Sequence, residues 1–322
     1  MNVSKKLHHY TACLASLTGY IYLSYFTDRT SFYQVFILYS FLFLSYAYLL
    51  SKNSDITLRV ITRRVTFDYK TGISAAIIFR ISLLFVLPDL SDDFYRFIWD
   101  GRLMANGENP FAFLPAHYLQ GINDKLYDHL NSPDYYSIYP PVCQFIFYTA
   151  CKLFPESILG SVVVMRLFIL LAEAGSIFLL NKLIRTFQLP QKAVLLYALN
   201  PLVIVELVGN LHFEAVMIFF LLLAVYLLAR AQPTSQLIKG RYKEVGSAIS
   251  FALAVGVKLL PLIFLPLLLK RLGFKKSIFY YLIVASCVLI LFIPFFSISH
   301  LTNLLSSFSL YLQKFEFNAS IY

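Results

Sequence analysis

Charged residues are scarce in this sequence: Asp, Glu, Lys and Arg together make up 14% of its 322 residues. A soluble domain usually carries about 25% charged residues. So few charges cannot cover the surface of a globule of this size, which excludes an ordinary soluble enzyme. Hydrophobic residues make up 59% of the chain, and this large share excludes a disordered protein. Both exclusions favour a membrane protein.

The sequence also lacks the common nucleotide motifs. It contains no Walker A motif, no Gly-rich dinucleotide motif and no nucleophile elbow, so nothing in it indicates the use of ATP or a soluble nucleotide sugar. Its four cysteines show no metal-binding spacing. Cys143 and Cys151, if helical, would lie about 12 Å apart, too far for a disulfide. We therefore expect the cysteines to pack, and the sequence indicates no cofactor or metal.

Long apolar runs predict transmembrane helices, which need about 17–25 residues each and satisfy their own backbone hydrogen bonds. A shorter apolar run, 138–154, is ambiguous, and the seventh long run is interrupted at Pro261. We therefore expect an all-α, polytopic membrane protein with eight or nine transmembrane helices. The long runs are 10–27, 31–50, 71–88, 158–181, 193–208, 213–229, 245–269 and 277–297.

Basic residues predict the orientation, because cytoplasmic loops of membrane proteins carry an excess of Lys and Arg. Five segments hold 18 of the 27 basic residues: 1–9, 51–70, 182–192, 230–244 and 270–276. With these segments in the cytoplasm, 89–137 lies outside and 138–154 becomes a lateral or re-entrant helix. The net charge of +10 then sets orientation and implies no nucleic-acid partner. Residues 298–322 also lie outside and end without a terminal signal, so we expect a fragment of a longer protein.

The outer loop 89–137 is acidic, with 8 of the chain's 17 Asp and Glu residues. Its Ser91–Arg102 stretch opens with an N-cap serine and two acids, and Asn106-Gly107 provides a stop. These signals predict a helix that places Asp93, Arg96 and Asp100 on one face. The other surface would lie in the membrane interface, and its residues are Phe94, Phe97, Ile98 and Trp99.

Such a helix would hold carboxylates rigidly at the outer face of the membrane. A carboxylate placed there can take a proton from a hydroxyl, and a nearby arginine can hold a phosphate. An ordinary solvated loop remains the alternative. Within the spans, Arg80, Arg166 and Glu173 are expensive to bury and should be paired or functional. Arg166 and Glu173 lie about 10 Å apart along a helix axis, so a direct pair between them is not expected.

The Ser91–Arg102 stretch resembles the first outer loop of bacterial GT-C superfamily glycosyltransferases, and most of all polyprenol-phosphate-sugar-dependent mannosyltransferase-like proteins. The resemblance covers about 75–318, and no such motif precedes residue 71. Further stretches agree in order, namely Gly107–Phe111, Ile138–Pro141, Asn200–Leu202, Gly209–Glu214 and Val257–Pro261. We therefore divide the chain into an N-terminal hairpin with a cytoplasmic loop, 1–70, and a GT-C-like catalytic region, 71–322.

The resemblance implies inverting transfer of a sugar, here mannose, from a polyprenyl-phosphate donor to a hydroxyl of a glycolipid or polysaccharide. The reaction would take place at the outer face of a bacterial inner membrane. The general base carried over is Asp93, with Asp92 as the second candidate. Glu214 stands where the family pattern leads us to expect Asp.

The remaining candidates surround this base. Lys258, one turn before Pro261 in a broken apolar helix, is expected to line a cavity and neutralise the donor phosphate, unless it snorkels to the interface. Arg96 and Arg102 are expected to help it, and Asp100 would orient Arg96 or bind acceptor hydroxyls. A second group should position sugar hydroxyls or the acceptor, unless it only solvates the helix ends: Glu206, Asn210, His212 and Glu214.

Two other classes of function stay open. In a flippase or transporter of lipid-linked saccharides, Arg166, Glu173 and Lys258 would form a substrate path. Transporters usually show internal repeats, and no convincing repeat is present here. In a non-catalytic membrane subunit, the acidic loop would be a docking surface.

Overall fold

The computed structural model describes residues 3–50, 67–117, 124–231 and 237–314. All regular structure in these ranges is helical, which agrees with the expected all-α class. The main helices are α1 (Val3–Tyr25), α2 (Phe32–Leu50), α4 (Tyr69–Ser82), α5 (Asp93–Ala105), α7 (Pro141–Leu153), α8 (Ile158–Thr186), α10 (Glu214–Arg230), α11 (Leu237–Val257), α12 (Leu265–Leu272), α13 (Phe274–Phe292) and α14 (Ile298–Lys314). Short elements join them: η1 (Pro115–His117), α6 (Asp124–Tyr127), η2 (Gln191–Val194), α9 (Leu195–Ala198), the π-helix η3 (Val203–Gly209), η4 (Leu260–Phe264) and η5 (Ile293–Phe295).

Three described helices are long and apolar enough to cross a membrane: α2, α8 and the run Phe274–Phe295. A bent pair, Gln191–Ala198 with Val203–Gly209, would make a fourth span. These helices agree with a membrane protein, while the full number of eight or nine spans stays a prediction. The expected continuous helix 193–208 is wrong, because the chain bends by 56° between the two halves. The break lies at Asn200-Pro201, and the residue before a proline disfavours helical backbone.

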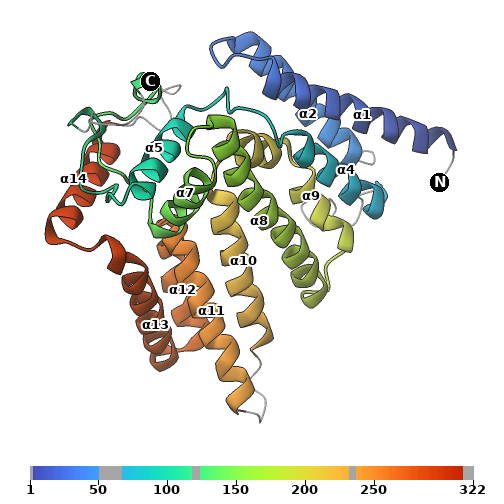
Figure 1. The fold of residues 1–322 in the computed structure, drawn as a ribbon. Helices are drawn as coiled ribbons and strands as arrows, with labels where there is room; N and C mark the ends of the chain where they lie inside the picture. The colour runs from blue at the N-terminus through green and yellow to red at the C-terminus, as the bar shows by residue number, and fades with distance from the viewer. Residues whose placement is uncertain (1–2, 51–66, 118–123, 232–236, 315–322) are drawn as a thin grey trace.

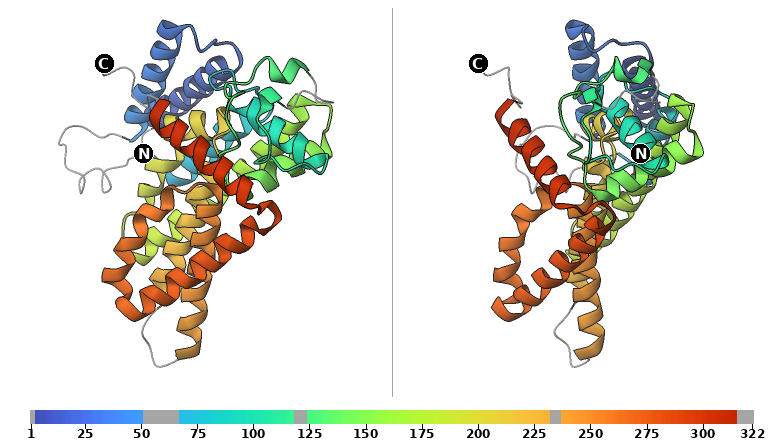
Figure 2. Two further views of the ribbon diagram at one scale, coloured as in Figure 1. Left: turned by 90° about the vertical axis from the view of Figure 1, so that its left-hand side faces the viewer. Right: turned by 60° about the vertical axis from the view of Figure 1, so that its left-hand side comes forward.

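The basic turns and the acidic loop lie at opposite ends of the long helices (Figures 1 and 2). The C-terminal ends of α8 and α10 and the α12–α13 turn are at the lower end in Figure 1, whereas α5 and α7 lie at the upper end. This separation agrees with the asymmetry of charge expected along the chain. The basic segment 51–66 and the chain end 315–322 lie outside the described residues.

Helix α5 packs against α7, and α10 lies between α8 and α11. The aromatic face of α5 is buried in this packing and not in the membrane interface, so the interfacial placement expected for it is wrong. Phe97 stacks on Phe147 of α7 with ring centroids 4.8 Å apart. The two helices approach so closely that a Cβ on Gly101 would lie 2.4 Å from the Phe147 carbonyl oxygen. The other buried residues of this face are Phe94, Ile98 and Trp99.

Helix α14 lies against the outer loop (Figure 2). The Asn303 side chain donates to the Phe111 carbonyl at 3.0 Å, and the backbone N–H of Tyr136 donates to Ser307 Oγ at 2.8 Å. Asn109 also donates to the Phe295 carbonyl at 3.2 Å. These contacts hold Asn109, Phe111 and Tyr136 of the outer loop against the C-terminal elements, so these parts of the loop belong to the packed structure.

Charged side chains within the predicted spans have fixed partners. Arg80 donates to Glu173 at 2.8 Å, with both side chains almost fully buried, and the Tyr197 hydroxyl donates to the same carboxylate. Arg166 donates to four backbone carbonyls and does not contact Glu173. Each residue therefore bonds to other segments of the chain, which is the structural role that the sequence had left open.

Candidate active site

Helix α5 presents the acidic motif. It begins at Asp93, one residue later than expected, because Asp92 occupies the N-cap position and Ser91 Oγ accepts from the Asp93 N–H at 3.4 Å. The end is as predicted: Asn106 is the C-cap, and Gly107 has a φ of +85°, a conformation that suits glycine. The Asp93 carboxylate therefore lies in the first turn, where the helix dipole favours negative charge.

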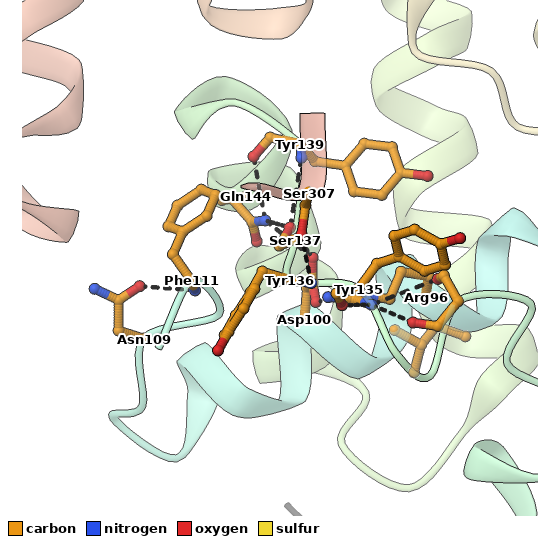
Figure 3. A network of polar contacts seen from close by, with 12 residues as sticks. Arg96, Asp100, Asn109, Phe111, Tyr135, Tyr136, Ser137, Tyr139, Gln144 and Ser307 are labelled. Carbon is orange, nitrogen blue, oxygen red and sulfur yellow. Dashed lines mark hydrogen bonds and ion pairs between the residues drawn. The ribbon is translucent and has the colours of Figure 1, made fainter. Parts of the chain in front are cut away.

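Asp100 is the centre of a buried polar network (Figure 3). Its carboxylate is fully buried and accepts from Arg96 Nε at 2.9 Å, from Gln144 Nε2 at 3.0 Å and from the Ser137 hydroxyl. These donors leave no exposed oxygen for a substrate hydroxyl. Of the two roles expected for Asp100, the orientation of Arg96 agrees with the structure, whereas acceptor binding does not.

Arg96 in turn organises the loop that follows. Its Nη1 donates to the carbonyls of Ser132 and Tyr135 at 2.9 and 2.8 Å. Its Nη2 is buried and has no hydrogen-bond partner among the described residues. A buried donor without a hydrogen-bond partner is costly.

A cavity of about 450 Å³ lies beside this arginine. Five of the predicted site residues line it together, from three separate parts of the chain: Asp93, Arg96, His212, Glu214 and Lys258. The lining also has an apolar part, which includes Ile138, Val257 and Leu260. Sequence reasoning missed Asn131, which lines the cavity and donates to Asp93 Oδ1 at 2.7 Å. It had also given no role to the tyrosines of the lining, Tyr135, Tyr136 and Tyr139.

Lys258 directly follows the last residue of α11 and precedes η4, so the predicted break at this point is confirmed. Its ammonium group pairs with the Glu214 carboxylate at the start of α10. The side chains are 53% and 31% exposed, so the pair is accessible from the cavity mouth. An anion that entered the cavity would compete with Glu214 for Lys258.

The two aspartates of the motif face different surroundings. Asp93 lines the cavity, whereas Asp92 pairs with Arg29 of the α1–α2 turn and lines a second hollow. In that hollow, partial burial and the nearby Asp28 raise the pKa of Asp89 above its usual value. Only Asp93 therefore shares a cavity with Arg96 and Lys258.

Glu206 and Asn210 lie behind the cavity rather than in its lining. Asn210 Nδ2 donates to Glu206 Oε2 at 2.9 Å, and that oxygen lies 3.6 Å from His212 Nδ1. The Tyr39 hydroxyl donates to the other oxygen of Glu206. Tyr39 was missed because it is one of 23 tyrosines and lies in a segment without a motif.

Arg102 does not reach the cavity lining, because it is six positions from Arg96 and points from another side of α5. Its expected contact with a donor phosphate is not supported. Among the described residues, no group of three or more His, Cys, Asp or Glu could hold a metal ion.

The comparisons with known proteins agree with the resemblance in its general form. A family model described as alpha-(1->6)-mannopyranosyltransferase, N-terminal domain, matches residues 11–272. No curated protein and no solved structure matches the chain. The matched range includes helices α2 to α11 and every residue that lines the cavity. Since it covers well over half of the sequence, the chain belongs to the alpha-(1->6)-mannopyranosyltransferase N-terminal domain family.

Proposed function

We propose that this mannosyltransferase is of the GT-C type and transfers mannose from a polyprenyl-phosphate donor to an acceptor hydroxyl, with inversion at the anomeric carbon. The reaction would take place in the cavity beside Asp93, at the outer face of a bacterial inner membrane. One observation carries the proposal: Asp93 and Arg96 of α5 line one cavity of about 450 Å³ together with Lys258, which is far from them in the sequence.

Asp93 acts as the general base. Its carboxylate accepts the proton of the acceptor hydroxyl, and the resulting oxygen attacks the anomeric carbon opposite the phosphate. Asn131 holds one oxygen of this carboxylate at 2.7 Å and limits its rotation. Asp92 is the less well supported candidate for this role, because its carboxylate pairs with Arg29 and lines a different hollow.

The leaving group is the lipid phosphate, which departs with the electron pair of the broken bond between the anomeric carbon and oxygen. The guanidinium group of Arg96 and the ammonium group of Lys258 stabilise the charge that develops on it. Lys258 exchanges its contact with Glu214 for the phosphate when the donor binds. The polyprenyl chain leaves the cavity along its apolar wall, past Ile138, Val257 and Leu260.

The acceptor is a hydroxyl of a glycolipid or polysaccharide. A transporter of lipid-linked saccharides is less well supported, because Arg166 and Glu173 already have fixed partners within the protein. Of the three residues that would form a transport path, only Lys258 lines the cavity beside Asp93.

The test is a transfer assay on purified protein in liposomes with polyprenyl-phosphate-[¹⁴C]mannose and a panel of lipid-linked mannoside acceptors. We expect Asp93→Asn to lose at least about 100-fold in rate, the usual contribution of general base catalysis. The matched control is Asp92→Asn, which should stay within about threefold of the wild-type rate. Full transfer by Asp93→Asn would remove it from the base role, and transfer from GDP-mannose without the lipid donor would refute the donor class.

A further inference from the structure

A side chain of the N-terminal hairpin contacts Glu206, the residue whose carboxylate lies beside His212 of the cavity lining. Tyr39 of α2 donates its hydroxyl to Glu206 Oε1, a contact across 167 positions of the sequence. Glu206 Oε2 accepts from Asn210 Nδ2 at 2.9 Å. Both oxygens of the carboxylate are thus engaged from two sides, and its orientation is fixed.

The same carboxylate faces His212. Its Oε2 lies 3.6 Å from Nδ1 of the imidazole, and the imidazole lines the cavity that also holds Asp93 and Arg96. A carboxylate beside Nδ1 favours the tautomer with its proton on that nitrogen. The other ring nitrogen, Nε2, is then a hydrogen-bond acceptor available to a hydroxyl group.

The backbone of this segment is unusual as well. Glu206 lies in a π-helix, a rare form that occurs mostly as single turns and is frequent at functional sites. Leu211, directly before His212, is buried and has a φ of +62°. That conformation costs a non-glycine residue of order 1–3 kcal/mol and persists only where the surrounding structure imposes it. The π-helix and the positive φ of Leu211 both lie directly before His212, which lines the cavity.

We propose that Tyr39 and Glu206 are positioning residues that orient His212 so that its Nε2 accepts a hydrogen bond from a saccharide hydroxyl in the cavity. The inference rests on the proposed function and extends it, because it makes the N-terminal hairpin part of the saccharide site. The shared chemistry is a sugar hydroxyl, which belongs either to the donor mannose or to the acceptor.

The chain offers a matched control for Tyr39 on the same helix. Tyr46 lies seven residues further along α2, and its hydroxyl donates to the Leu196 carbonyl at 2.8 Å. Tyr46→Phe therefore removes one hydroxyl contact from α2, just as Tyr39→Phe does. Of these two contacts, only that of Tyr39 is made with a residue, Glu206, that lies beside a residue of the cavity lining, His212.

The kinetic test measures kcat and KM for donor and acceptor separately in the liposome assay. We expect Tyr39→Phe to lower kcat/KM about three- to tenfold, with the change confined to the substrate whose hydroxyl His212 binds. Tyr46→Phe should stay within twofold. His212→Asn should lower kcat/KM more than Tyr39→Phe does. The double variant, Tyr39→Phe with His212→Asn, should lower kcat/KM no more than His212→Asn alone, because the effects of residues that act through one contact are not additive. Equal effects of the two tyrosine substitutions, or additive losses in the double variant, would overturn the proposal.

A second measurement does not depend on turnover. Nitrogen-15 NMR of histidine-labelled protein, with the His212 signal identified from its loss in His212→Asn, reports the tautomer directly. We expect the Nδ1-protonated form in the wild type and in Tyr46→Phe, and a mixture in Tyr39→Phe. The wild type in the Nε2-protonated form, or an unchanged tautomer in Tyr39→Phe, would refute the positioning role. If the wild type shows the expected tautomer but transfers no mannose, the proposed function and the saccharide role of His212 are both refuted. Only the orientation of the His212 ring by Tyr39 and Glu206 would then stand.

Discussion

Asp100→Asn removes the negative charge from the buried pair with Arg96 while it keeps the size of the side chain. The two side chains are 0% and 3% exposed, and the carboxylate also accepts from Gln144 and Ser137. An amide in its place has one acceptor oxygen and presents two N–H donors to groups that need an acceptor. Removal of one partner from a buried pair costs about 3–5 kcal/mol.

The assay is thermal unfolding of the purified protein in detergent. Since the entropy of unfolding is about 2.1 cal/mol/K per residue, about 1 kcal/mol lowers the Tm of a 322-residue chain by roughly 1.5 °C, and Asp100→Asn should lower Tm by about 4–8 °C. The control is Asp92→Asn, whose partner Arg29 is 50% exposed. Such a surface pair contributes about 0–1 kcal/mol, so its Tm should change by no more than a few degrees.

A double variant separates stability from chemistry. Arg96→Met with Asp100→Leu removes both buried charges, and replacement of a whole buried pair by apolar residues is often neutral or stabilising. We expect this variant to recover much of the lost Tm and yet to transfer no mannose, because it lacks the guanidinium group of Arg96 in the cavity lining. Equal Tm values for Asp100→Asn and Asp92→Asn would refute the reasoning about burial, and transfer by the double variant would refute the role of Arg96.

Three other substitutions have distinct expected outcomes. Gly101→Ala should destabilise the protein by about 1–3 kcal/mol in thermal unfolding through overpacking, because its Cβ would lie 2.4 Å from the Phe147 carbonyl oxygen. The control is Gly246→Ala, where the nearest atom is 3.4 Å from the new Cβ and the stability should stay the same or rise. Lys258→Gln should raise the donor KM at least about tenfold through a lost charged contact, whereas Lys276→Gln, whose pair with Glu244 lies away from the cavity, should not. Asp89→Asn should flatten the pH dependence of Tm: the pKa of Asp89 is raised in the folded state, so the stability that it provides is present at low pH and is lost as pH rises through that pKa.

The sequence predicted those parts of the site that depend on local signals or on the distribution of charge. The start and stop of α5 follow from Ser91, the two aspartates and Asn106-Gly107, and they are correct to one residue. The separation of basic and acidic segments placed Asp93, His212, Glu214 and Lys258 at one end of the molecule. The cavity lining brings these four residues together, although they are spread over 165 positions of the chain.

Features that depend on long-range packing could not be predicted. The aromatic face of α5 has the composition of an interfacial helix, and only the close approach of α7 at Gly101 shows that this face is buried. The close approach of α7 also brings Gln144 against Asp100. Asp100, a candidate ligand for the substrate in the sequence, is therefore a buried partner of Arg96 in the structure. Tyr39 gives no signal in the sequence, because its role depends on a contact with Glu206 in a distant element.

The charges buried in the helices and the charges at the cavity have different tasks. Arg166 uses its whole guanidinium group on backbone carbonyls: Leu84 and Val86 before the acidic motif, and Val208 and Gly209 before His212. It therefore joins the two segments of the chain that lead to Asp93 and to His212. A transport path needs polar groups that exchange protein contacts for substrate contacts, and carbonyls fixed in the backbone turns of two segments are poor candidates for such exchange. Lys258 and Glu214, both partly exposed and both in the cavity lining, can exchange partners without disturbing these segments. The buried contacts therefore stabilise the segments that form the cavity, and the residues of the cavity lining bind the substrate and transfer the proton in the proposed mechanism.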